Sequence, residues 1–186
     1  MSNIDIIKSN FQENQKINSI SSSQILESID IATSKILSML DSSGKLLACG
    51  NGGSSGDAQH IASEFINRFE SERKPLPAIS LNSDTATLTS IANDYGYQYV
   101  FSKQIKAIGN PDDILMVFTT SGNSINILDA IVTAKDKNIP IILVSGDNGG
   151  KACASLDQND IKILVPSTRT SRIQEMHLVI IHSICE

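Results

Sequence analysis

The spacing of the hydrophobic positions changes near residue 45. Before this point they recur at the three- and four-residue intervals of amphipathic helices. We expect one helix over residues 3–17 and a second that begins at the serines 21–23, as capping residues, and runs to Gly44. After this point short apolar runs alternate with longer amphipathic stretches, and the runs that we expect to form strands are residues 45–49, 78–81, 114–118, 139–144 and 161–165.

The five apolar runs are continuous, with few polar residues between the apolar ones. This is typical of parallel strands that are covered on both faces. The stretches between the runs are long enough for crossover helices, so the sequence predicts an α/β fold with a doubly wound, five-stranded parallel sheet. We expect a single domain over residues 1–186. The extra N-terminal helices within residues 1–43 exceed what one sheet face needs, and we expect a partner subunit to cover them.

Composition excludes several classes of function. The chain has 15 basic and 20 acidic residues, a net charge of −5, which argues against a nucleic-acid surface. No apolar stretch reaches the roughly 18 residues of a membrane span, and the N-terminus lacks the basic and apolar regions of a signal peptide. The three cysteines have no CxxC spacing, which favours reduced thiols. We therefore expect a cytoplasmic protein that binds neither nucleic acid nor membrane.

A glycine-rich stretch at residues 50–56 directly follows the first strand run. A helix that begins there would present unpaired backbone N–H groups, together with the hydroxyls of Ser54 and Ser55, to an anion or a sugar oxygen. One turn further on, His60 and Glu64 are four residues apart and share one face of that helix. The sequence thus predicts a phosphate-sized site beside a His/Glu pair.

A second loop, TTSGNS at residues 119–124, follows the third strand run. Four hydroxyls, several loop N–H groups and a helix that we expect to begin near Asn123 converge there, as in anion-binding sites. The loop has neither the lysine of a P-loop nor the GxGxxG spacing of a dinucleotide site. We therefore expect it to hold a sugar monophosphate through neutral donors. The alternative is that its Ser and Thr residues only cap the helix.

The last predicted helix, from Ser171 onward, carries polar residues among many apolar ones. At 100° per residue, His182 lies about 20° from Glu175 and about 80° from Gln174, so helical geometry favours Glu175 as its companion. A single histidine on such a helix is more often a hydrogen-bonded core residue than a ligand, and we assign His177 to the core. The segment 93–97, taken alone, indicates an Asx turn after a helix over residues 84–92.

Five motifs, in this order and at these spacings, resemble the sugar-isomerase (SIS) domain, and most closely the phosphoheptose isomerases. They are CGNGGS at 49–54, DAQHIASEF at 57–65, NDYGY at 93–97, TSGNS at 120–124 and RIQEMHLVIIH at 172–182. The resemblance implies a flavodoxin-like homotetramer with active sites between subunits. It also implies conversion of sedoheptulose 7-phosphate to D-glycero-D-manno-heptose 7-phosphate, the first step towards heptose for lipopolysaccharide or other surface glycans.

The resemblance assigns roles to residues at the matching positions. It implies that substrate contacts come from Asn51, Gly52, Gly53, Asn93 and Asp94, and that the phosphate is held by Thr119, Thr120, Ser121 and Ser124. It implies one Zn²⁺ per subunit, with ligands His60, Glu64, Gln174 and His182, of which Glu64 and Gln174 also contact the substrate. It therefore selects Gln174 where the helical angle selected Glu175.

Ketose–aldose isomerisation needs a positioned base and a proton donor. We expect Glu64 to be the base and His182 the acid, because an imidazole titrates near neutral pH. The alternative function is an adaptor, because INRFESERKPLPAISLN, IAND and RIQEMH also resemble SIS proteins that bind the bacterial replication initiator. At the positions of Glu64 and His182 those proteins lack the carboxylate and the imidazole. Both groups are present here, which favours an enzyme.

Overall fold

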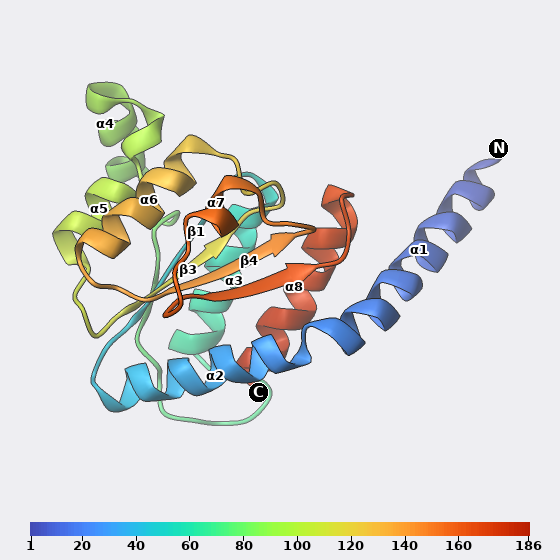
Figure 1. The fold of residues 1–186 in the computed structure, drawn as a ribbon, viewed down its shortest axis with the longest axis horizontal. Coiled ribbons are helices and arrows are strands. Elements are labelled where there is room, and N and C mark those ends of the chain that lie inside the picture. The colour runs from blue at the N-terminus through green and yellow to red at the C-terminus, as the bar shows by residue number, and fades with distance from the viewer.

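The centre of the molecule is a five-stranded, all-parallel sheet in the order β2-β1-β3-β4-β5 (Figure 1). The structure, a computed structural model, describes residues 1–186. The strands are β1 (Leu46–Gly50), β2 (Ala78–Ser80), β3 (Ile114–Phe118), β4 (Ile141–Gly146) and β5 (Ile161–Val165). The predicted α/β fold with five parallel strands is confirmed, and each strand lies within two residues of its expected bounds.

Helices cover both faces of this sheet (Figure 1). One face is covered by α2 (Leu26–Asp41), α3 (Gly53–Ile66) and α8 (Thr170–Cys185). The other face is covered by α4 (Thr85–Tyr95), the 3-10 helix η1 (Tyr97–Tyr99), α5 (Ser102–Ile108), α6 (Ile125–Asp136) and α7 (Gly150–Ala154). No helix combines the length and apolar character needed to cross a membrane.

The two covered faces explain the continuous apolar runs. Along β1, Leu46 and Ala48 pack into the layer of α2, α3 and α8, whereas Leu47 and Cys49 pack into the opposite layer. All four side chains are buried. Since burying a leucine contributes about 1.5–3 kcal/mol, each strand stabilises both layers.

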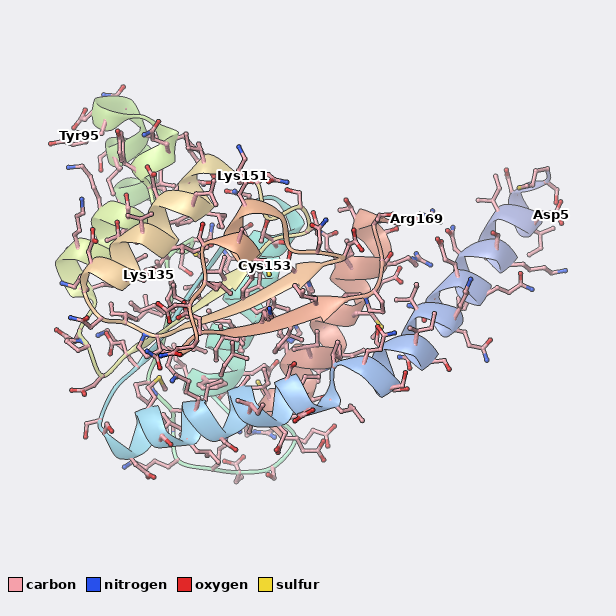
Figure 2. All side chains as sticks on the ribbon, viewed as in Figure 1. Asp5, Tyr95, Lys135, Lys151, Cys153 and Arg169 are labelled. Carbon is pink, nitrogen blue, oxygen red and sulfur yellow. The ribbon has the colours of Figure 1, made fainter.

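The N-terminal helix α1 (Asn3–Gln24) projects beyond the sheet, with Asp5 near its outer end (Figures 1 and 2). The predicted boundary at residues 17–21 was wrong. The hydroxyls of Ser22 and Ser23 donate to the carbonyl oxygens of Ser19 and Ile20 inside the helix, so these serines cap nothing. Only Ile25 separates α1 from α2.

A second boundary also differs from the prediction. Asp84 caps α4 by accepting a hydrogen bond from the backbone N–H of Thr87, and the helix runs through Tyr95 before it ends at Gly96. Asn93 and Asp94 therefore lie in the last turn of α4, and the expected Asx turn after residue 92 was wrong.

Strand order places the candidate site at the junction of β1 and β3. From β1 the chain continues outward to β2, whereas β3 is followed by β4 and β5 on the other side. Cys49 pairs with Val117 and Gly50 with Phe118, so the two strands end side by side. Ligands of open α/β sheets bind beyond the strand ends at such a switch point. The loops at residues 51–53 and 119–124 meet there.

Candidate active site

The loop after β1 offers unused hydrogen-bond donors. Asn51 and Gly52 donate their backbone N–H groups to no acceptor in the chain, and α3 begins at the next residue. Gly52 has φ +56°, a left-handed conformation that glycine adopts without strain. Unused N–H groups at the start of a helix can bind an anion or a sugar oxygen. The structure thus supports the predicted substrate contacts of this loop.

About two turns into α3, three predicted site residues meet at a single atom. The Nε2 atom of His60 lies 3.2 Å from Oε1 of Glu64 and 3.4 Å from Nε2 of His182. The spacing of His60 and Glu64 on one helical face is confirmed. His182 comes from α8, which packs against α3. A carboxylate and an imidazole from different helices therefore contact the same nitrogen atom of His60.

Two separations between donor atoms at this position are those expected between zinc ligands. Ligands of a tetrahedral zinc ion, with bonds of about 2.0–2.1 Å, lie about 3.4 Å apart. The separations at His60 match this spacing, and two imidazoles with one carboxylate are donors that zinc accepts. No group of three or more His, Cys, Asp or Glu side chains is arranged to hold a metal ion, so the zinc site stays a prediction.

The structure distinguishes Gln174 from Glu175. A Cβ atom at Gly53 would lie 2.3 Å from Nε2 of Gln174, so this side chain packs against the sugar-binding loop. Glu175 instead accepts hydrogen bonds from Arg172, at 2.5 Å, and from Asn14 of α1, at 2.6 Å. The helical-angle preference for Glu175 was wrong. A helical wheel compares only the directions of side chains on one helix. It does not show what each side chain meets on a neighbouring helix, and here Gln174 lies against Gly53 whereas His182 lies against His60, at different turns of α3.

The loop after β3 is a second group of donors. The backbone N–H groups and the hydroxyls of Thr120, Ser121 and Ser124 donate to no acceptor in the chain. Ser124 is the N-cap residue of α6 but makes no side-chain cap bond, which disfavours the capping alternative. Thr119 differs from the other three, because its buried Oγ1 accepts the N–H of Gly122 at 3.1 Å and so shapes the turn.

Gly122 is required in this turn for two reasons. It has φ +65°, and a Cβ atom there would lie 1.8 Å from the carbonyl oxygen of Gly149. The loop that follows β4 therefore supports the predicted phosphate site from behind. Lys151, in α7, also holds it, because its backbone N–H donates to Oδ1 of Asn123 at 3.2 Å.

Asn93 and Asp94 are not brought to the rest of the site by any hydrogen bond. Both are exposed at the end of α4, and Nδ2 of Asn93 donates to Oδ1 of Asp94 at 2.8 Å. Tyr97, three residues later, does reach the site, where its hydroxyl lies 3.4 Å from Oδ1 of Asn51. The implied substrate contacts of Asn93 and Asp94 stay predictions.

Comparison with known proteins identifies the family. The SIS-domain family profile matches residues 11–146. A phosphoheptose isomerase of Chromohalobacter salexigens is 54% identical over 158 residues, which cover 85% of this chain and 80% of the relative. The chain belongs to the phosphoheptose isomerase family.

Solved structures of the phosphoheptose isomerase family agree with this assignment. The phosphoheptose isomerase of Francisella tularensis has a TM-score of 0.97 and 42% identity, with 100% of this chain and 97% of that chain covered. The phosphoheptose isomerase of Neisseria gonorrhoeae has a TM-score of 0.94 and 38% identity, with 99% and 97% covered. The fold inferred from the resemblance is thus confirmed along the whole chain.

Two residues beside the site were not found from the sequence. Phe69 stacks on His182 with ring centroids 5.3 Å apart, and Arg73 donates to the carbonyl oxygens of Glu64, at 2.8 Å, and Cys185, at 2.5 Å. Both lie in the irregular segment between α3 and β2, where no periodic pattern of hydrophobic residues indicates which side chains face the rest of the domain. Arg73 thereby ties the ends of α3 and α8 together.

His177 is the core residue that the sequence indicated. It is fully buried, and its Nδ1 lies 3.2 Å from Oδ2 of Asp57, which is also buried. Its Nε2 has no hydrogen-bond partner in the chain. Because Asp57 lies on α3, the pair is a second connection between α3 and α8.

Proposed function

We propose that the chain is an aldose–ketose isomerase that converts sedoheptulose 7-phosphate to D-glycero-D-manno-heptose 7-phosphate. The observation that carries the proposal is the contact of Glu64 and His182 with the same nitrogen atom of His60, on the helix that follows the sugar-binding loop. Membership of the phosphoheptose isomerase family supports the choice of substrate.

The reaction moves one proton between neighbouring carbon atoms. In the proposed mechanism Glu64 takes the proton from C1 of the open-chain ketose while His182, whose Nε2 faces His60, donates a proton from Nδ1 to O2, which gives an enediol(ate). His182 then takes the proton from O1 while Glu64 returns its proton to C2, which yields the aldose. Glu64 and His182 are regenerated, so atoms and charges balance over the cycle. Phe69, stacked on His182, helps to hold the imidazole in one orientation.

We propose that His60, Glu64, Gln174 and His182 hold one Zn²⁺. The two donor separations at His60 and the mixed nitrogen and oxygen donor set support this assignment. When bound, the ion would supply a Lewis acid for the sugar oxygens. The free donors of Thr120, Ser121 and Ser124 would bind the phosphate, with Thr119 holding the turn behind them.

We further propose that the protein is a cytoplasmic homotetramer in which α1 and α2, within residues 1–43, form subunit contacts. The outer half of α1 exposes Ile4, Ile7 and Phe11, and a second copy would bury these side chains. Assembly would also bring Asn93 and Asp94 towards a neighbouring site. A monomer at micromolar concentration in light scattering would contradict this part of the proposal. The product would supply heptose for lipopolysaccharide or related surface glycans.

The activity is tested by incubating the protein with sedoheptulose 7-phosphate and following the aldose by NMR, with and without a chelator. We expect conversion in the untreated sample and loss of conversion after chelation, with recovery on adding Zn²⁺. A zinc-loaded protein that leaves the ketose unchanged would contradict the proposed function. If such a protein instead captured the bacterial replication initiator, the adaptor alternative would replace it.

A further inference from the structure

Two asparagine side chains join the two ligand loops. Nδ2 of Asn51 donates to Oδ1 of Asn126 at 2.8 Å, and Nδ2 of Asn126 donates back to Oδ1 of Asn51 at 2.9 Å. Asn51 lies in the loop after β1, and Asn126 lies in the first turn of α6, directly after the phosphate loop. The Asn126 side chain is buried, with 3% exposure. The reciprocal amide pair is thus the direct link between the loops.

A third segment joins the same pair. The hydroxyl of Tyr97, in η1 after the end of α4, donates to Oδ1 of Asn51 at 3.4 Å. Asn51 Oδ1 therefore accepts from two different segments, and its Nδ2 is held by Asn126. The backbone N–H of Asn51 has no acceptor in the chain, and Nδ2 uses only one of its two hydrogens, so both groups can still donate to substrate.

We propose that Asn126 is a positioning residue that holds the sugar-binding loop at a fixed distance from the phosphate loop. The inference rests on the proposed isomerase function. Asn126 acts through Asn51, because both hydrogen bonds of its side-chain amide go to Asn51 and none goes to a predicted zinc ligand.

This role predicts a particular split of the kinetic constants. Without the amide pair the loop samples other conformations, and only a fraction of the molecules can bind substrate. The apparent affinity is the intrinsic affinity multiplied by this fraction. Bound substrate contacts both loops and restores their spacing, so the rate at saturation changes little. For Asn126→Leu, which keeps the branched shape of the side chain but removes both hydrogen bonds, we expect KM to rise about tenfold and kcat to stay within about twofold. Asn126→Asp keeps one bond, and we expect a smaller rise.

A double-mutant cycle tests whether Asn126 acts through Asn51. If it does, Asn126→Leu added to Asn51→Ala leaves KM within about twofold of the Asn51→Ala value. KM increases that multiply, or an unchanged KM in the folded Asn126→Leu and Asn126→Asp variants, would overturn the proposal. The control is Thr133→Val, which alters another buried polar residue of α6 away from the loops and leaves KM unchanged even where it lowers Tm.

A measurement without substrate separates this inference from the proposed function. The N–H groups of Ser54 and Ser55 close the turn by donating to the carbonyl oxygens of Asn51 and Gly52, each at 3.0 Å. In Asn126→Leu we expect hydrogen–deuterium exchange at these two amides to speed up about tenfold, with exchange in β3 and β4 unchanged. Unchanged exchange at Ser54 and Ser55 would refute the positioning role even if the protein isomerises the sugar. Faster exchange at these amides would support the positioning role even if the protein does not isomerise the sugar.

Discussion

Replacing Glu64 by glutamine removes the proposed base and changes one proposed zinc ligand from a carboxylate to an amide, while it alters the fold little. The glutamine keeps the size of the side chain and can still hydrogen-bond to His60, which Glu64 contacts at 3.2 Å. The core contacts of α3 at this level come from Ile61 and Phe65, which point away from the site into the buried layer. We therefore expect the free energy of unfolding to change by less than about 1 kcal/mol.

The expected loss of activity is large. A positioned acid or base contributes about 10²- to 10⁴-fold to a rate, equivalent to about 2.7–5.4 kcal/mol of activation free energy. We expect kcat of Glu64→Gln to fall at least about 100-fold, with a smaller change in KM. The assay is NMR of aldose formation from saturating sedoheptulose 7-phosphate, with circular dichroism to verify folding.

Glu175→Gln is the matched control for this experiment. Glu175 is also a half-buried helical carboxylate next to the site, but it pairs with Arg172 and Asn14. We expect its substitution to leave kcat within about threefold, since partly exposed ion pairs contribute little. Near-normal turnover in folded Glu64→Gln, or a 100-fold loss in Glu175→Gln, would refute the assignment of Glu64 as the base.

Three further outcomes follow from the structure. Mass spectrometry of purified protein should find about one zinc per chain, and His60→Ala should abolish it; full occupancy in that variant would contradict the proposed ligands. Phe118→Ala should lower the free energy of unfolding by about 3–5 kcal/mol in urea, because Phe118 is fully buried at the end of β3. Burial raises the pKa of Cys49 from 9.0 to about 12. The stabilisation from its neutral thiol is therefore present below pH 9 and lost as pH rises towards 12, and the stability difference between wild type and Cys49→Ala should shrink by about 1.4 kcal/mol per pH unit in this window. A pH-independent difference would contradict the burial of the thiol.

The sheet could be predicted because each strand is a short apolar run bounded by polar residues. Strands β3 and β5 begin and end where the runs do. The spacing of His60 and Glu64 was equally readable, because both lie on one helix. Local patterns were insufficient at Ser22 and Ser23, since a serine can cap a helix or bond to a carbonyl oxygen inside one.

Contacts between distant segments explain what the sequence did not reveal. Gln174 and Glu175 are adjacent, and the difference between them lies in what each meets: Gly53 of α3 for the first, Asn14 of α1 for the second. Asn126 resembles any polar residue at the start of a helix, and its role is visible only where it meets Asn51. Pairings of this kind depend on the assembled fold and leave no periodic pattern.

The most direct test is a crystal structure of the protein with sedoheptulose 7-phosphate bound. The account predicts the phosphate against the N–H and hydroxyl groups of Thr120, Ser121 and Ser124, with C1 and C2 of the sugar within reach of Glu64 and His182. A sugar phosphate bound elsewhere, or bound with C1 and C2 remote from both side chains in every subunit, would contradict it.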